Sequence, residues 1–267
     1  MVDPVHADSP IDLSELERLA GPYRARYLAA APWPHLVVDG LVDPATVAAA
    51  ETQEIDRALA LKVERAHRTV KAESPEVNGQ AATDILDALL APQFVDFLEQ
   101  VTGIAGLLPD PSHALAGLHV SPPGAFQALH RDFRLHPHNG LFHRVNVLVF
   151  LNSDWPPEYG GDLELWPADT SACGQRIAPV AGKLVMFETT PTSFHGIPDP
   201  ITCPPSRARL SLASYYYTDY PGPQDRRDLS LFPPRRPQDP RSIDVQKFKD
   251  VAERLGGLAK RAFAKNR

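Results

Sequence analysis

Two side chains that often bind metals, His130 and Asp132, stand two residues apart near the middle of the chain. In a strand, alternate side chains share a face, so both can point at one site. A third ligand must come from elsewhere in the fold, and His195 is the candidate. Two imidazoles and one carboxylate on one side of a metal leave its other side open, which suits Fe(II) with a bidentate organic ligand and O2. A polar strand end, or a histidine satisfied within a turn, is the alternative interpretation of the His-x-Asp pair.

Two zinc chemistries do not fit the sequence. The His-Glu-x-x-His pattern of zinc proteases is absent. A structural zinc site needs several cysteines, and the chain has only Cys173 and Cys203, which are far apart.

Residues 206–217 are rich in aromatic and apolar side chains and predict a strand. Its alternation places Arg209, Ser211, Ala213 and Tyr215 on one face. An arginine that projects from a buried strand needs a partner, because an unpaired buried charge is unfavourable. A guanidinium binds a carboxylate through two parallel hydrogen bonds. We therefore predict that Arg209, with Ser211 beside it, holds a carboxylate-bearing cosubstrate; the alternative is a salt bridge to an Asp or Glu of the chain itself.

Together with further short motifs, these residues resemble the Fe(II)- and 2-oxoglutarate-dependent oxygenases, in particular their prolyl 4-hydroxylase-like branch. The resemblance covers roughly residues 33–218. Its motifs are residues 34–39 (PHLVVD), 130–132 (HRD), 151–155 (LNSDW), 160–166 (GGDLELW), 179–187 (PVAGKLVMF), His195 and Arg209-x-Ser211.

The resemblance implies a dioxygenase that hydroxylates an unactivated C–H bond and decarboxylates 2-oxoglutarate to succinate. It implies iron ligands at His130, Asp132 and His195, and it implies that Arg209 pairs with the far carboxylate of 2-oxoglutarate, with Ser211 nearby. The expected cofactors are Fe(II), 2-oxoglutarate and O2, with ascorbate as an additional reductant. The substrate is then a prolyl residue of a peptide or a small metabolite such as an amino acid.

Two positions depart from the resemblance. Ala128 stands where some relatives have a tyrosine, and the other departure, at Phe150, bears on the cosubstrate. Many prolyl hydroxylases carry a tyrosine just before the Leu-Asn pair, and its hydroxyl helps hold the same carboxylate, whereas this chain has Phe150. Either another hydroxyl takes its place, from Ser211 or a nearby tyrosine, or the cosubstrate is held less tightly.

Two other functions stay open from the sequence. A cupin-like metal enzyme would work without 2-oxoglutarate and use Arg209 to bind a substrate acid. A non-catalytic binding module would keep only the fold. Succinate production that depends on both iron and 2-oxoglutarate distinguishes the first interpretation from these two.

Length, composition and net charge limit the number of domains, the classes of partner and the cellular compartment that we expect. A chain of 267 residues with 43% hydrophobic residues can form one large domain with appendages. Its net charge of −6 does not favour nucleic-acid binding. The first ten residues are polar and do not resemble a secretory signal. No apolar run is long enough for a membrane span. Two cysteines that are far apart in the sequence do not indicate a disulfide scaffold. We expect a cytoplasmic protein; the sequence does not set its oligomeric state.

The element pattern predicts a mostly β fold with supporting helices, built on a double-stranded β-helix or jelly roll. Four parts are expected: a helical extension at 1–32, the oxygenase domain at 33–220, a Pro/Arg-rich linker at 221–242, and a basic helix at 243–267. The Gly21-Pro22 pair should interrupt the first helix, and Asp43-Pro44 should begin the next one. The basic helix would dock on a partner or an anionic surface, or else pack on its own domain.

Two polar stretches, residues 65–79 and 134–143, read as loops long enough to cover the site. The second directly follows Asp132. We therefore predict that at least one of Arg131, Arg134 and His136 contacts the substrate.

Overall fold

The computed structural model describes residues 9–219, apart from residues 67–68, 75, 114 and 137–138, and in addition Ser230, Phe232 and Pro233. The expected linker and basic C-terminal helix therefore lie outside the described residues, except for those last three. Within the described part, no helix is long and apolar enough to cross a membrane.

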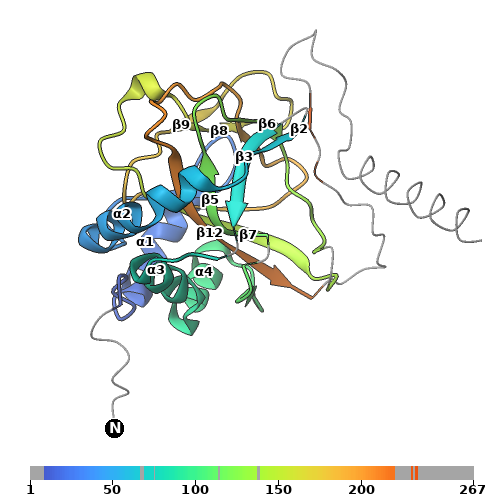
Figure 1. The fold of residues 1–267 in the computed structure, drawn as a ribbon. Coiled ribbons are helices and arrows are strands. Elements are labelled where there is room, and N and C mark those ends of the chain that lie inside the picture. The colour runs from blue at the N-terminus through green and yellow to red at the C-terminus, as the bar shows by residue number, and fades with distance from the viewer. Residues whose placement is uncertain are drawn as a thin grey trace, which may run out of the picture.

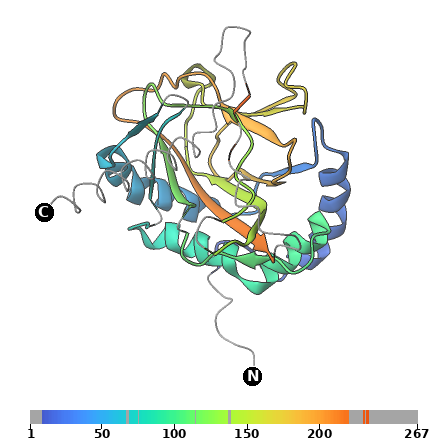
Figure 2. The same cartoon turned by 90° about the vertical axis from the view of Figure 1, so that its right-hand side faces the viewer.

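The four α-helices of the described chain all lie in its first half, with strands between them, and they gather on one side of the sheet (Figures 1 and 2). They are α1 (Leu16–Ala29), α2 (Pro44–Ala60), α3 (Gln80–Leu90) and α4 (Pro92–Thr102). The start of α2 is as predicted, because the Asp43 carboxylate accepts a hydrogen bond from the backbone N–H of Thr46 at 2.8 Å and Pro44 occupies the first turn. Helix α4 ends at Gly103, whose φ of 78° is the left-handed conformation that glycine adopts without strain.

The expected interruption at Gly21-Pro22 is wrong, since Pro22 lies inside α1. A proline removes one helical hydrogen bond, but tertiary contacts hold this helix. Its inner face buries Leu16 and Tyr27. The Arg24 guanidinium also donates to the carbonyl of Gln100 at 3.1 Å, at the end of α4.

The strands form one strongly curled antiparallel sheet. In chain order they are β1 (His35–Val38), β2 (Glu64–Ala66), β3 (Thr69–Ser74), β4 (Leu108–Pro109), β5 (Gly117–Ser121), β6 (Phe126–His130), β7 (Phe142–Phe150), β8 (Leu163–Trp166), β9 (Gln175–Ile177), β10 (Leu184–Glu188), β11 (Phe194–Ile197) and β12 (Arg209–Thr218). Their spatial order is β1-β10-β7-β12-β5-β3-β6-β11-β8-β9. Strand β3 pairs with β5 through Ala72–Ser74 and with β6 through Thr69–Val70, so it joins a larger half-sheet to a smaller one. This is the jelly-roll arrangement expected from the sequence.

The two faces of β12 explain how the sheet separates core from cavity. Leu210, Leu212 and Tyr216 pack into the hydrophobic cluster that includes the helices. The Tyr216 hydroxyl donates to the carbonyl of Leu89 at 2.6 Å and so ties α3 to the sheet. The alternate residues, among them Arg209 and Ser211, face a cavity on the other side.

The expected loop at residues 65–79 is wrong over most of its length, because β2 and β3 occupy it. Within β3 the even-numbered residues Val70, Ala72 and Ser74 are buried, and the odd-numbered ones are more exposed. This period of two is the strand signal, and charged residues on one face disguised it.

A buried carboxylate fixes the start of α3 and gives a test of the helical layer. Glu54 has no exposed surface and accepts hydrogen bonds from the backbone N–H groups of Asn78 and Gly79, both at 2.7 Å. Glu54→Ala should lower the free energy of unfolding by about 2–4 kcal/mol, because it leaves buried donors unpaired. Urea unfolding measures this change. Glu17→Ala, at an exposed position of α1, is the matched control and should change stability little.

Candidate active site

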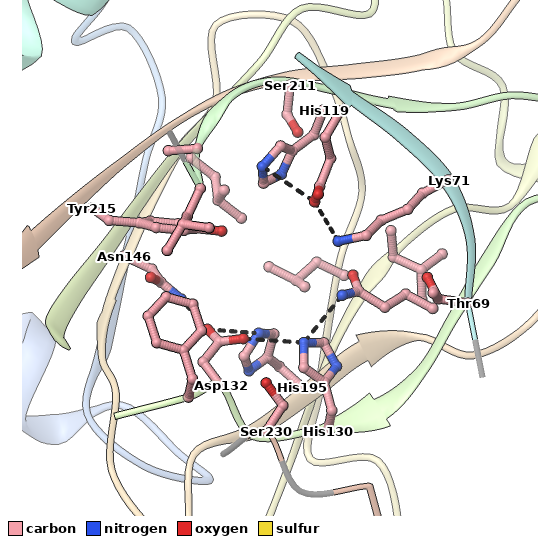
Figure 3. A pocket seen from close by; sticks show the side chains of 18 of the residues that line it. Thr69, Lys71, His119, His130, Asp132, Asn146, His195, Ser211, Tyr215 and Ser230 are labelled. Atoms are coloured by element: carbon pink, nitrogen blue, oxygen red, sulfur yellow. Dashed lines mark hydrogen bonds and ion pairs between the residues drawn. The ribbon is translucent and has the colours of Figure 1, made fainter. Parts of the chain in front are cut away.

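A cavity of about 450 Å³ opens between the two halves of the sheet. Its lining comes from both halves, so the register of the strands decides which residues meet there. Figure 3 shows His130, Asp132 and His195 on one side, His119 and Ser211 on the opposite side, and Thr69 and Lys71 between them.

The three residues predicted as metal ligands come together. His130 ends β6, and Asp132 follows it. His195 on β11 is the direct cross-strand partner of His130, and the centroids of the two rings are 4.4 Å apart. One potential ligand atom from each residue lies within 4.8 Å of those of the other two. The antiparallel pairing of β6 and β11 therefore provides the distant third ligand.

Backbone carbonyls orient both imidazoles. The Nδ1 atom of His130 lies 3.0 Å from the carbonyl oxygen of Ala128, and that of His195 lies 3.0 Å from the oxygen of Ser193. In each ring, an Nδ1–H that donates to the carbonyl leaves a lone pair on Nε2. These Nε2 atoms face Asp132, at 3.2 Å from Oδ1 and 3.6 Å from Oδ2 respectively.

Asp132 is held from a second strand as well. The side-chain amide of Asn146 on β7 donates to its Oδ2 at 2.6 Å. Asn146 is the one polar side chain in the segment 145–150 of β7, and this contact explains why that buried segment carries an amide.

Protonation states at neutral pH suit a divalent metal. Burial lowers the pKa of His195 to about 4, although the Asp132 carboxylate opposes this shift. Burial alone would raise the pKa of Asp132, but the neighbouring His195 and His130 outweigh it and keep the pKa well below its usual value. A carboxylate and the Nε2 atoms of two imidazoles directed at one point form the donor set that Fe(II) sites of this kind use. The residues present therefore fit such a metal.

Arg209 lies on the opposite wall with 3% of its surface exposed. Its Nε–H donates to the carbonyl of Gly161 at 2.8 Å, and its guanidinium carbon lies 4.7 Å from the centroid of the Phe150 ring. Burial lowers the pKa of Arg209 to about 10, so the group stays charged at neutral pH, and Asp162 opposes the shift. The internal salt bridge considered above is not found among the described residues, since none of their carboxylates forms an ion pair with Arg209.

Two motif residues explain how Arg209 is positioned. Gly161 has a φ of 83°, and a Cβ there would lie 3.1 Å from Cδ of Arg209, so a larger residue would push the arginine away. Asn152 is fully buried and bonds both neighbours of Arg209: its amide donates to the carbonyl of Ala208 and its oxygen accepts from the N–H of Leu210, each at 2.8 Å.

Other sequence candidates lie elsewhere. Arg207 donates to the carbonyl of Ser153 at 2.5 Å, near Glu51, and does not line the cavity. Arg131, Arg134 and His136 do not line it either. Arg134 lies over the ring of Phe142, and His136 packs edge-on against Tyr217. The cavity as it stands gives no support to their expected substrate contact.

The sequence reasoning missed several cavity residues. Lys71 and Glu73 reach it from β3, and His119 reaches it from β5. The alternation in residues 69–74 was the available signal for the first two. Phe232 stacks on His130, with ring centroids 5.4 Å apart and planes 23° apart, and it had no local signal because it follows the sheet in a proline-rich stretch.

Comparisons with known proteins agree with this geometry. Residues 116–217 match the family model of the 2OG-Fe(II) oxygenase superfamily. Mouse prolyl 3-hydroxylase OGFOD1 is 30% identical over 101 residues, which are 36% of this chain and 17% of the mouse protein. The chain thus matches less than a fifth of that relative's length. The resemblance expected from the sequence is confirmed for the matched segment.

Solved structures show the same fold. A prolyl-4-hydroxylase from Pseudomonas putida aligns with a TM-score of 0.54 at 22% identity, covering 76% of this chain and 100% of its own. A prolyl hydroxylase from Trichoplax adhaerens, in complex with a peptide fragment of hypoxia inducible factor, aligns with a TM-score of 0.54 at 15% identity, covering 77% of this chain and 91% of its own. The expected fold class is confirmed.

The metal assignment can be tested without a substrate. His130→Ala and Asp132→Ala should each abolish binding of Mn(II), a stable substitute for Fe(II), because two ligands are too few for tight binding. Isothermal titration calorimetry measures the binding, and circular dichroism checks the fold. His113→Asn, a buried histidine outside the cavity, serves as the control and should bind like wild type. Unchanged binding in both ligand variants would contradict the assignment.

Proposed function

We propose that this chain, whose residues 116–217 belong to the 2OG-Fe(II) oxygenase superfamily, hydroxylates an unactivated C–H bond and converts 2-oxoglutarate to succinate. The observation that carries the proposal is the arrangement of two kinds of polar group in one cavity. Three potential metal ligands meet on one wall, and a buried arginine with no carboxylate partner among the described residues lies on the other.

His130, Asp132 and His195 would hold Fe(II). When bound, the iron supplies the activation of O2 that couples the decarboxylation of 2-oxoglutarate to oxidation of the substrate. The chain's part is to keep both Nε2 lone pairs and the carboxylate directed at one point. The carbonyls of Ala128 and Ser193 and the amide of Asn146 do this.

Arg209 would bind the far carboxylate of 2-oxoglutarate, with Ser211 beside it. The guanidinium is prepared for this role, because Gly161 and the Phe150 ring fix its position. A charged group that is already desolvated and oriented binds a complementary anion with less loss of freedom. Ser211 is 1% exposed and lines the same cavity two residues further along β12.

The substrate would approach the side chains that adjoin the metal ligands. The Gln127 amide nitrogen lies 3.2 Å from Nε2 of His130, and Phe232 stacks on the same imidazole. We propose a prolyl residue of a peptide or a small metabolite as the substrate, in line with the names of the related hydroxylases. Both cysteines are free thiols, which fits an enzyme of the reducing cytoplasm.

A cupin-like enzyme without 2-oxoglutarate is the alternative that the same ligands allow. Succinate release separates the two functions, because only the proposed one requires iron and 2-oxoglutarate together. Panels of proline-containing peptides and free amino acids, scored for a product that has gained one oxygen atom, would then identify the substrate class.

The cosubstrate assignment makes a quantitative prediction. Arg209→Ala should raise the 2-oxoglutarate concentration needed for half-maximal succinate release by roughly a hundredfold, since a charge-assisted bidentate pair is lost. Arg207→Ala is a matched control, because this arginine lies two residues away and points to Ser153 and Glu51 instead. An unchanged requirement in the Arg209 variant, or an equal effect in the Arg207 variant, would contradict the assignment.

A further inference from the structure

A row of four side chains crosses the larger half-sheet on the cavity side. In the strand register, Glu73 of β3 is opposite His119 of β5, His119 is opposite Ser211 of β12, and Ser211 is opposite Phe150 of β7. Directly opposite residues of antiparallel strands project from the same face. Because Arg209 precedes Ser211 by two residues, its side chain projects from this face as well.

The row is polar on one flank of Ser211 and apolar on the other. Phe150 provides no hydrogen-bond donor, although it stands where many prolyl hydroxylases have a tyrosine hydroxyl. His119 occupies the equivalent place on the opposite flank of Ser211, one strand away. His119 and the residue at position 150 are therefore both direct cross-strand neighbours of Ser211, one on each side.

The Nε2 atom of His119 has no hydrogen-bond partner among the described residues and is shielded from solvent. Its nearest acidic neighbour, Oε1 of Glu73, is 3.6 Å away, which exceeds an ordinary hydrogen bond. That carboxylate is instead paired with Lys71. A buried ring nitrogen without a partner is unfavourable, so its position in the cavity points to a ligand group that satisfies it.

We propose that His119 is the second protein donor to the far carboxylate of 2-oxoglutarate, acting with Arg209 and taking the place of the hydroxyl that Phe150 lacks. This inference rests on the proposed function. Figure 3 shows His119 and Ser211 together, across the cavity from His130, Asp132 and His195. A 2-oxoglutarate molecule with its keto acid end at the metal and its far carboxylate at His119 would span the cavity between these two groups.

The charges around His119 are consistent with this role. Burial lowers the pKa of His119 to about 4, with Glu73 opposing and Lys71 and Arg209 reinforcing the shift. The ring is thus neutral at pH 7 and carries one N–H. A neutral donor beside a charged arginine lets the site bind one carboxylate without excess positive charge. The ion pair with Lys71 balances the negative charge of Glu73, so Glu73 repels an incoming anion less strongly.

The test measures binding rather than turnover. Protein loaded with Mn(II) is titrated without oxygen by 2-oxoglutarate and, in parallel, by 2-oxopentanoate, which has the same chain length but no far carboxylate. His119→Ala should weaken binding of 2-oxoglutarate by roughly tenfold or more, as expected when a hydrogen bond to a charged group is lost. Its affinity for 2-oxopentanoate should equal that of wild type.

Three further variants sharpen the result. His119→Gln keeps a donor and should retain most of the affinity. Adding Phe150→Tyr to His119→Ala should restore much of it, because the hydroxyl returns on the other flank of Ser211. Thr69→Val changes a cavity residue outside the row and should bind both acids like wild type.

The possible results distinguish a failure of the His119 proposal from a failure of the proposed oxygenase function. If wild-type protein binds 2-oxoglutarate and Arg209→Ala weakens it, while both His119 variants remain correctly folded and bind like wild type, the role of His119 is refuted and the proposed function stands. Equal weakening for both acids in His119→Ala would also refute it. If loaded wild-type protein does not bind 2-oxoglutarate, both proposals fall.

Discussion

Among the described residues no carboxylate forms an ion pair with the buried guanidinium of Arg209. Its burial is unfavourable, because the charge loses water and its contacts, the Gly161 carbonyl and the Phe150 ring, are neutral. Much of the larger half-sheet serves to keep it there. Gly161 gives it space and a carbonyl, Phe150 offers the face of its ring, and Asn152 braces the backbone on both sides. Desolvation lowers the pKa of the arginine to about 10 without removing its charge at neutral pH. The interior thus holds a fixed positive charge at one wall of the cavity.

The alternation of β12 couples this polar wall to the stability of the domain. Each residue that faces the cavity is followed by one that packs against the helices, so the helical layer holds the strand from behind. Tyr216 illustrates the connection, since its hydroxyl bonds to α3 while its neighbour Tyr215 lines the cavity. The helices contribute no cavity residue among those described, but they fix the strand that carries Arg209 and Ser211.

Local patterns were sufficient to predict the fold class and to predict that the three potential ligands, Arg209 and Ser211 come together, and all five line one cavity. Short motifs and the alternation of a single strand carry that information. The roles of these five residues remain predictions. Local patterns were not sufficient for His119, which meets the other cavity residues through pairing of β5 with strands that are distant in the sequence. The prediction failed at Pro22 because packing of α1 outweighs its local helix-breaking effect. It failed at β3 because charged residues on one face imitate a loop. Phe232 could not be predicted, since only the folded chain brings it to His130.

Strand β3 fixes the distance between the two walls of the cavity, because it pairs with a strand from each wall. It pairs with β5 through Ala72–Ser74 and with β6 through Thr69–Val70, so a continuous ladder of backbone hydrogen bonds links the strand of His119 to the strand of His130. The two walls cannot move apart without breaking that ladder. If each wall binds one end of a dicarboxylic acid, as proposed, the separation of the walls sets the length of acid that reaches both, and a shorter acid would reach only one. In the proposed function, the backbone of the sheet would therefore determine which length of dicarboxylic acid fits, independently of the side chains that would bind its two ends.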